Sequence, residues 1–345
     1  MSAARKKKKS RTGLYIVIIL LVIGFIGAYT VFGPNTGELT QGEYLYIHSG
    51  SDYNALKAAL VKGDFISSMT TFDLLAKQAK LPDHVHAGKY RIRKGMSNYN
   101  IVRMLHSGRQ TPVRIVINRL RTKQDLVNLL CMNLEADSSA MKQMLSSPKF
   151  AEEYGLDTNT ILCAIMQNSY EFFWNTSAEK AFSKIEKTYA HYWDDAHKQA
   201  AQAHGLTPAK AVILAAIVDE ETNINDDKPR IASVYLNRLK KGMRLQADPT
   251  VKYAAGNFTA HRIAGVMLQS TSPYNTYMYA GLPPGPINTP SVSSIEAVLN
   301  APQTTYLYFC AAPDFSGRSN FATTYDEQLK NAREYQQALN AHNIH

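Results

Sequence analysis

The clearest hydrophobic pattern in the chain lies between residues 208 and 243. From Ala209 to Val218 only Lys210 is polar, which predicts a helix that is buried on most of its sides rather than along one stripe. Thr207 suits the N-cap of such a helix, and Pro208 suits its first position, where a missing N–H has no cost. We therefore expect a core helix that begins at Pro208.

A second helix is predicted after a short turn. Asp226 or Asp227 caps it, Pro229 lies just inside its first turn, and Gly242 ends it. Its apolar positions recur at helical spacing, so we expect one face to pack against the core helix. That face carries Ile231, Val234, Tyr235 and Leu239.

Three acidic residues, Asp219, Glu220 and Glu221, end the core helix. The C-terminal end of a helix carries partial negative charge, which disfavours carboxylates there. A carboxyl group at that position, beside apolar side chains and like charges, should have a raised pKa. A raised pKa is what a general acid requires. A solvated acidic helix end would give the same pattern, so these residues alone leave both interpretations open.

Upstream, the chain alternates short strands and helices. Residues 42–50 alternate in polarity and are rich in β-forming side chains, which predicts a strand. Helices are predicted at 51–61 and 67–80, where capping side chains precede Leu and Ala at helical spacing. A second strand, a glycine turn and a helix that ends at Gly108 follow. The order is therefore strand, helix, helix, strand, helix.

From residue 111 onward, strands and helices are mixed without a regular βαβ repeat, so the predicted fold class is α+β. Strands are expected at 112–120, directly after Asp248, and at 304–311, and helices at 123–134, 138–145, 178–204, 291–299 and 325–345. We interpret the aromatic residues at 170–174 as part of the core rather than as a surface that stacks on sugars. Residues 272–290 are too rich in Pro, Gly and Asn for regular structure. A long loop that also carries Tyr and Thr suits a saccharide cleft.

Residues 13–32 form an uncharged apolar run whose helical length, about 30 Å, matches the core of a bilayer. The Lys and Arg block before it keeps the N-terminus in the cytoplasm by the positive-inside rule. A cleavable signal peptide is the alternative, but its apolar region is usually about 7–15 residues and ends in an Ala-x-Ala-like site. The predicted organisation is a cytoplasmic basic segment (1–12), a transmembrane helix (13–33), a linker (34–42), a small subdomain (43–110) and a larger domain (111–345).

Composition narrows the choice of function. The formal net charge is +10, but much of it lies in the block that adjoins the apolar run, so we expect no nucleic-acid partner. The three cysteines are an odd number for an exported chain, and we interpret them as buried small hydrophobic residues. No Cys or His spacing suggests a metal site, and there is no glycine-rich phosphate loop. We therefore expect no cofactor.

Several runs of sequence resemble one known family. AAIVDEET, IASVYLNRLKKGMRLQADPTVKY and SPYNTYMYAGLPPGPINTPSVSSIEAVLNAP are similar to the catalytic domain of the MltG (YceG-like) endolytic murein transglycosylases. The resemblance is close from residue 206 onward and looser upstream. The catalytic glutamate of that family is the second acid of a Glu-x-Glu-Thr-like motif, which falls on Glu221, and Asp219 occupies the place of the first acid. Where the family has a Pro-Glu-Gly turn, this chain has Asn118, Arg119 and Leu120, and no chemistry is assigned there.

The family also carries a LysM-like subdomain before its catalytic part, which implies that residues 43–110 are LysM-like. LysM modules bind amino-sugar chains, but a unit of this size also fits a spacer. Relatives carry a Pro-Asp-Thr-Tyr-like turn at the position of Asn168 and Ser169. The expected fold is thus a transmembrane helix, a small LysM-like α/β subdomain and a mixed α+β YceG-like catalytic domain.

The resemblance implies an enzyme of the cell inner (cytoplasmic) membrane that cleaves MurNAc–GlcNAc bonds of peptidoglycan to give 1,6-anhydroMurNAc ends. Glu221 would be its general acid and base, the catalytic domain would lie outside the cytoplasm, and membrane glycan synthases would be partners. Candidates for orienting the sugars are Gln246, Asp248, Asn275 and Tyr277. Two alternatives stay open: a hydrolytic muramidase with Asp248 as a second carboxylate, and a noncatalytic peptidoglycan-binding protein.

Overall fold

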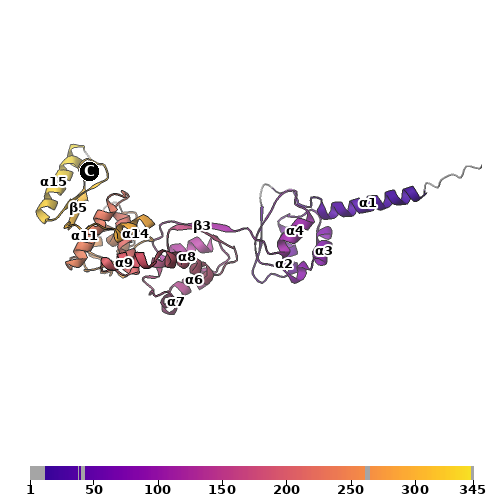
Figure 1. Cartoon of the computed structure of the whole chain (residues 1–345), viewed down its shortest axis with the longest axis horizontal. Helices are drawn as coiled ribbons and strands as arrows, with labels where there is room; N and C mark the ends of the chain where they lie inside the picture. Colours follow the sequence, from indigo (N-terminus) through magenta and orange to yellow (C-terminus); the bar gives the residue numbers. More distant parts are fainter. Residues whose placement is uncertain (1–11, 38, 40–42, 261–264, 343–345) are drawn as a thin grey trace, which may run out of the picture. The chain divides into compact units, whose positions relative to one another are not determined.

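The structure is a computed structural model that describes residues 12–37, 39, 43–260 and 265–342. It contains two compact units, and Figure 1 labels their elements. The first unit comprises residues up to Val113 together with 171–176, and the second comprises 114–170 and 177–345. Helices and short antiparallel strands are mixed in both, as the predicted α+β class requires.

The first unit follows the predicted order of strands and helices. Its elements are α1 (Thr12–Phe32), β1 (Glu43–Ile47), α2 (Tyr53–Lys62), α3 (Met69–Gln78), η1 (Leu81–Asp83), β2 (Gly88–Ile92) and α4 (Asn98–His106). Strands β1 and β2 pair antiparallel, with Leu45 opposite Tyr90. Alternate residues of both strands point inward, and with Phe72 and Ile101 they form a core whose members are almost fully buried. The strand and helix predictions for this segment are confirmed.

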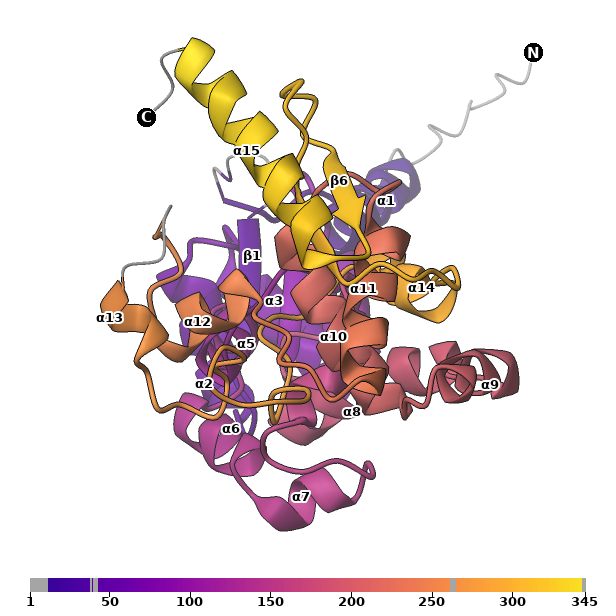
Figure 2. The ribbon, with the colours of Figure 1, turned by 90° about the vertical axis from the view of Figure 1, so that its left-hand side faces the viewer.

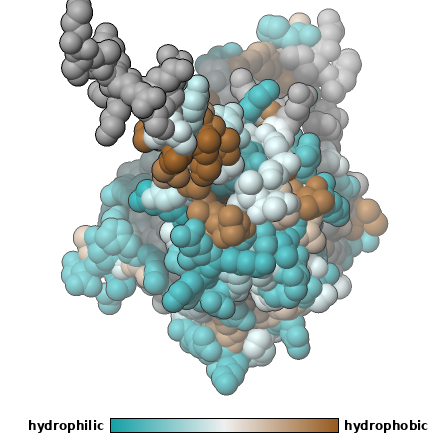
Figure 3. All heavy atoms as spheres, turned by 90° about the vertical axis from the view of Figure 1, so that its right-hand side faces the viewer, coloured by the Kyte–Doolittle hydropathy of each residue, from teal (hydrophilic) through white to brown (hydrophobic). Residues whose placement is uncertain are grey.

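Helix α1 coincides with the predicted apolar span. It is 21 residues long, is apolar enough to cross a membrane, and none of its residues is buried. Figure 3 shows apolar side chains at the surface on the side of the molecule that carries α1. The basic segment predicted at 1–12 lies outside the described residues except for Thr12, and the predicted linker at 34–42 is described only in part.

The second unit contains the remaining elements, except that Val113 of β3 and residues 171–172 of β4 belong to the first unit. They are β3 (Val113–Ile117), α5 (Lys123–Cys131), α6 (Ser138–Leu145), α7 (Pro148–Glu152), η2 (Ile161–Ala164), β4 (Asn168–Phe172), α8 (Ala178–Tyr192), α9 (Asp195–Ala203), α10 (Pro208–Glu221), α11 (Lys228–Lys240), α12 (Asp248–Ala254), α13 (Gly265–Leu268), α14 (Val292–Leu299), β5 (Tyr308–Ala311), β6 (Ser319–Ala322) and α15 (Tyr325–Ala341). Residues 269–291 contain no helix or strand, as predicted for 272–290.

Helix α10 is the centre of the second unit. The side chain of Thr207 accepts a hydrogen bond from the backbone N–H of Lys210, and every residue from Ala211 to Asp219 is buried. Figure 2 shows α11, α12 and α14 around it, and each of these helices contacts it. Burial of each large apolar side chain contributes about 1.5–3 kcal/mol, so this helix is held in place along most of its length. The prediction of a core helix that begins at Pro208 is confirmed.

The predicted partner of the core helix is also present. On α11, the side chains of Ile231, Val234 and Tyr235 are buried, and α11 packs on α10. Asp227 is the residue before the first turn, but its carboxylate does not cap that turn. It accepts instead from the backbone N–H of Ser319 at 2.6 Å and pairs with Arg230 at 3.1 Å. Asp227 therefore ties the start of α11 to the β5–β6 hairpin.

Two predictions of regular structure are wrong. The single long helix expected at 178–204 is two helices, because Asp194 accepts a hydrogen bond from the N–H of His197 at 2.9 Å and starts a new helix there. The strand expected after Asp248 is a helix, α12, because Pro249 in its first turn favours a helical start. In both cases a local capping signal outweighed the pattern of apolar residues.

Two further segments differ from expectation in part. Where a turn was implied at Asn168 and Ser169, the chain forms strand β4, which pairs with β3. Tyr170 and Phe172 on β4 are buried, as predicted for the aromatic cluster, but Phe173 is 55% exposed. The strand expected at 304–311 is confined to 308–311 and is only half buried, because it pairs with β6 in a two-stranded sheet.

Of the cysteines, Cys163 is buried, whereas Cys131 and Cys310 are half-buried, and all three are free thiols.

Candidate active site

The three consecutive acids at the end of α10 point into three different environments. Asp219 accepts hydrogen bonds from the hydroxyls of Ser291 and Ser294, at 2.7 and 2.6 Å, where α14 begins. Successive side chains on a helix diverge by about 100°, so the two glutamates that follow must face elsewhere. The side chain of Glu221 therefore does not share the serine partners of Asp219.

Arginine side chains form ion pairs with the first two acids, Asp219 and Glu220. Arg119 lies 2.9 Å from Oδ2 of Asp219 and 3.4 Å from Glu220, and Arg121 lies 3.2 Å from Glu220. Asn288 also donates to Glu220 at 2.8 Å. The pKa of Asp219 is lowered, because the hydrogen bonds from the two serine hydroxyls and the charge of Arg119 outweigh the effect of burial. Asp219 is thus held as a carboxylate, which suits structure rather than proton donation.

Glu221, the last residue of α10, has a different environment. Its Oε1 accepts a hydrogen bond from the hydroxyl of Tyr235 at 2.6 Å, and no cation pairs with it among the residues the structure describes. Desolvation is the main reason that the pKa of Glu221 is raised from 4.5 to about 7, and the nearby charge of Asp248 raises it further. The hydrogen bond from Tyr235 and the charges of Lys252 and Arg238 act in the opposite direction. Near neutral pH this carboxyl group can both give and take a proton.

Glu221 opens into a pocket of about 230 Å³. Three of the predicted sugar-binding residues line the same pocket, namely Gln246, Asp248 and Tyr277. The hydroxyl of Tyr277 donates to Oδ1 of Asp248 at 2.6 Å, which holds that carboxylate in place. Gln246 has a φ of 50°, a left-handed conformation that is uncommon for residues other than glycine and that often occurs at functional sites.

The fourth predicted sugar-binding residue, Asn275, does not line this pocket. Its side chain is fully buried, and its amide nitrogen donates to the carbonyls of Leu268 and Ser270 at 2.9 and 2.8 Å. Its Oδ1 accepts from the backbone N–H of Tyr277 at 3.0 Å. Asn275 therefore shapes the loop that presents Tyr277.

Several residues of the site were not singled out from the sequence. Arg238 faces the pocket while it donates to the carbonyls of Leu307 and Leu245, both at 2.7 Å. Tyr235 was expected only as a packing residue, although the polar tip of a buried tyrosine usually needs a partner. Arg119, on the stretch to which no chemistry was assigned, holds two of the three acids. Two basic residues directly after strand β3 were the signal that could have revealed this role.

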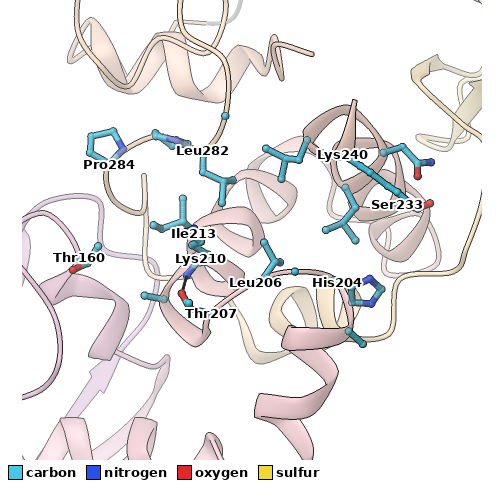
Figure 4. A pocket seen from close by; sticks show the side chains of 18 of the residues that line it. Thr160, His204, Leu206, Thr207, Lys210, Ile213, Ser233, Lys240, Leu282 and Pro284 are labelled. Atoms are coloured by element: carbon cyan, nitrogen blue, oxygen red, sulfur yellow. Dashed lines mark hydrogen bonds between the residues drawn. The ribbon is translucent and has the colours of Figure 1, made fainter. Parts of the chain in front are cut away.

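A larger cleft of about 1260 Å³ lies around the other end of α10 (Figure 4). Leu206, Ile213 and Leu282 line it together with the exposed Lys210 and Lys240. Its one acidic lining residue is Asp157, whose Oδ1 is occupied by the backbone N–H groups of Asn159 and Thr160 at 2.7 and 2.8 Å. The pKa of Asp157 is lowered, because these hydrogen bonds and the charge of Lys123 outweigh the effect of burial, so the carboxyl group does not suit a proton donor. Size alone therefore does not make this cleft the active site. Within the described residues no group of three His, Cys, Asp or Glu side chains could hold a metal ion.

The α+β fold and the pocket around one carboxyl group with a raised pKa define an acid–base enzyme. A model of the YceG-like family matches residues 45–334, and the chain therefore belongs to the YceG-like family. A Bacillus subtilis endolytic murein transglycosylase is 30% identical over 340 residues, which cover 91% of each chain. A Streptococcus pneumoniae protein of the same name is 22% identical, and the match covers 94% of this chain and 66% of the relative.

A solved structure supports the fold. The crystal structure of a YceG-like protein from Listeria monocytogenes matches with a TM-score of 0.57 and 27% sequence identity. The match covers 84% of this chain and 98% of the Listeria chain. The family resemblance predicted from the sequence is thus confirmed.

The raised pKa of Glu221 predicts a pH-dependent cost to stability. Between pH 4.5, the reference pKa of a glutamate, and about 7, the folded protein keeps a proton that the unfolded chain releases, so stability falls as the pH rises through this range. The loss is complete above pH 7 and amounts to about 3 kcal/mol at most, since one pKa unit corresponds to about 1.4 kcal/mol and the pocket admits some solvent. Glu221→Gln has no such loss, so its melting temperature should exceed that of the wild type at pH 8.

The control for this comparison is pH 5, where most of the difference should vanish. Thermal unfolding followed by circular dichroism at both pH values measures it. A Glu221→Gln protein that is no more stable than the wild type at pH 8 would contradict the assigned burial of this carboxyl group.

Proposed function

We propose that this chain is a membrane-anchored endolytic lytic transglycosylase that cleaves MurNAc–GlcNAc bonds in peptidoglycan glycan strands. The observation that carries the proposal is the carboxyl group of Glu221, which lies in a pocket, bonded to a tyrosine and free of any paired cation in the described chain. Its pKa of about 7 suits a group that acts as acid and then as base near neutral pH. The names of the curated relatives support the same activity.

The reaction needs one carboxyl group. Protonated Glu221 donates its proton to the glycosidic oxygen, and the bond between that oxygen and the anomeric carbon of the muramyl sugar breaks. The carboxylate of Glu221 then takes the proton of the C6 hydroxyl of the same sugar while the C6 oxygen bonds to the anomeric carbon. The product is a 1,6-anhydroMurNAc end, no water is consumed, and Glu221 is protonated again. Gln246 and Tyr277 orient the sugars, and Asn275 acts through the loop that carries Tyr277.

A hydrolytic muramidase is the second candidate, because Asp248 lies in the same pocket as Glu221. An ordinary glycosidase uses two carboxyl groups, one as acid and one as base or nucleophile. Asp248 is bonded to the Tyr277 hydroxyl, which fits a role in shaping the pocket. The two reactions differ in their products, since a hydrolytic end is heavier than an anhydro end by one water molecule.

Substitution of the two carboxyl groups tests the mechanism. Glu221→Gln keeps the shape of the side chain and an acceptor for Tyr235 but removes the proton donor, so cleavage of sacculi should fall by roughly 10²–10⁴-fold or more. Asp248→Asn should lower the rate only moderately, through the geometry of the Tyr277 loop. Mass spectrometry of the released fragments should find anhydro ends.

The matched control is Glu220→Gln. It changes the neighbouring residue but leaves an amide oxygen that can still accept from Asn288 and from the two arginines that contact Glu220. Most activity should remain, and circular dichroism confirms that each variant is folded. Full activity in folded Glu221→Gln would end the assignment, and reducing ends together with an inactive Asp248→Asn would establish the muramidase instead.

We propose further that residues 43–110 form a LysM-like subdomain that binds glycan, with the catalytic domain at 111–345 and a linker at 34–42. Tyr44 and Tyr46 point outward from β1 and are 37% and 41% exposed, and Trp174 lies edge-on to Tyr46 at 5.0 Å. Lys89 lies over the ring of Tyr44 at 4.0 Å. Aromatic rings beside cations suit the C–H faces of sugars and the carboxylates of peptidoglycan.

Binding to sacculi tests this role separately from cleavage. In the Glu221→Gln background, Tyr46→Ala should weaken co-sedimentation of the protein with sacculi several-fold, and the exposed Leu74→Ala on α3 serves as the control. Equal co-sedimentation of the two double variants would identify the subdomain as a spacer.

We also propose that α1 anchors the chain in the inner (cytoplasmic) membrane, with the N-terminus in the cytoplasm and the chain after Gly33 outside it. The apolar length of α1 and the basic residues that precede it in the sequence support this topology. An export-dependent reporter fused after the C-terminus should be active, and the mature chain should retain residues 13–33. Activity of a cytoplasm-dependent reporter would contradict the topology, and a mature chain that begins near Gly33 would indicate a cleaved signal peptide.

Membrane glycan synthases remain the partners that the family resemblance implies for such an enzyme. Crosslinking in intact cells, followed by identification of the captured proteins, tests this part of the proposal. Absence of any glycan synthase among specifically crosslinked proteins would count against it.

A further inference from the structure

Tyr235 occupies a fixed position beside the catalytic carboxyl group. It is 2% exposed, it lies in the middle of α11, and its ring packs edge-on against Phe309 with centroids 5.9 Å apart. Its hydroxyl donates to Oε1 of Glu221 at 2.6 Å, across the contact between α11 and α10. The tyrosine cannot turn away without loss of both its packing and its hydrogen bond.

The strength of this hydrogen bond changes during the proposed reaction. While Glu221 is protonated, the bond joins two neutral groups. Once Glu221 has donated its proton, the acceptor is a carboxylate, and hydrogen bonds to an ionised group are shorter and about twice as strong. An interaction that strengthens as the reaction proceeds lowers the barrier, whereas one that is equally strong throughout does not.

The charged groups near Glu221 do not donate a hydrogen bond to it in the described structure. Arg238, also on α11, is held by backbone carbonyls at 2.7 Å, and Oδ1 of Asp248 accepts from Tyr277. Lys252 on α12 and the Asp248 carboxylate influence Glu221 through their charges, without a hydrogen bond to it in the described structure. Within the structure as described, Tyr235 is therefore the hydrogen-bond donor to this carboxyl group.

We propose that Tyr235 is a positioning residue for Glu221: it holds Oε1, so that Oε2 carries the transferred proton, and it sets the pH range over which the enzyme works. This inference rests on the proposed function of Glu221. The sequence alone places Tyr235 on a packing face, and its role follows from the contact between the two helices.

The pH dependence of kcat/KM distinguishes positioning from packing. Loss of protonated Glu221 produces the alkaline limb of the profile, because the first step needs the acid. Tyr235→Phe keeps the ring but removes the donor, so the carboxylate is less stabilised and the limb should move upward by about one pH unit, with kcat about tenfold lower. The assay is release of muropeptides from sacculi by the purified full chain in detergent.

Tyr192→Phe is the matched control. Tyr192 donates to Oε1 of Glu296 at 2.7 Å, so this variant removes a tyrosine–glutamate hydrogen bond of the same kind from outside the pocket. Its alkaline limb should stay at the wild-type pH. If Tyr235→Phe also keeps the wild-type limb while its rate falls equally at every pH, the residue only packs and the proposal is overturned.

A second variant covers the case in which Tyr235→Phe does not fold. A difluorotyrosine inserted at position 235 is a more acidic phenol and a stronger donor, so its alkaline limb should move to lower pH, and an unchanged limb would again overturn the proposal. Glu221→Gln measured alongside separates the two claims. An active Glu221→Gln rejects the proposed function, whereas an inactive Glu221→Gln with unmoved limbs in the Tyr235 variants rejects only the role of Tyr235.

Discussion

The site depends on the partial removal of one carboxyl group from water. Glu221 ends a helix that is buried along nine consecutive residues, from Ala211 to Asp219, so its position is fixed by the core rather than by a loop. Burial disfavours the charged form and raises the pKa of Glu221 to about 7. The partial negative charge at the end of the helix acts in the same direction. Helices α11, α12 and α14 pack around α10 and hold this carboxyl group at the pocket.

The neighbouring acids show how the protein confines this effect to a single residue. Asp219 and Glu220 lie in the same last turn of the helix as Glu221, yet serine hydroxyls, Asn288 and two arginines stabilise them. The arginines come from the stretch after β3 and the serines from the start of α14, so distant parts of the chain set the charge of each acid. Glu221 has none of these partners, and its carboxyl group accepts a hydrogen bond from Tyr235 on helix α11.

Much of this arrangement could be predicted from the sequence, and the exceptions have physical causes. The apolar run 209–218 predicted the core helix, because helical burial is a local property. The acids that follow it left a solvated helix end as an open alternative, and the choice of Glu221 among them came from the family resemblance. The break at Asp194 and the helix after Asp248 depended on capping, which apolar periodicity does not report. The ion pairs of Arg119 join residues 100 positions apart, and no local pattern specifies such a partner. Gln246, Asp248 and Tyr277 do meet in one pocket, whereas Asn275 uses its amide to order the loop.

The central claim is that Glu221 exchanges its proton near neutral pH. Its titration can be observed directly by carbon NMR of protein labelled at the side-chain carboxyl groups of glutamate, with Glu221→Gln used to assign the signal. The account predicts one glutamate resonance with a midpoint near pH 7, absent from the Glu221→Gln spectrum. If every glutamate instead titrates at or below about pH 5, as solvated carboxyl groups do, the carboxyl group of Glu221 is not held in the environment described.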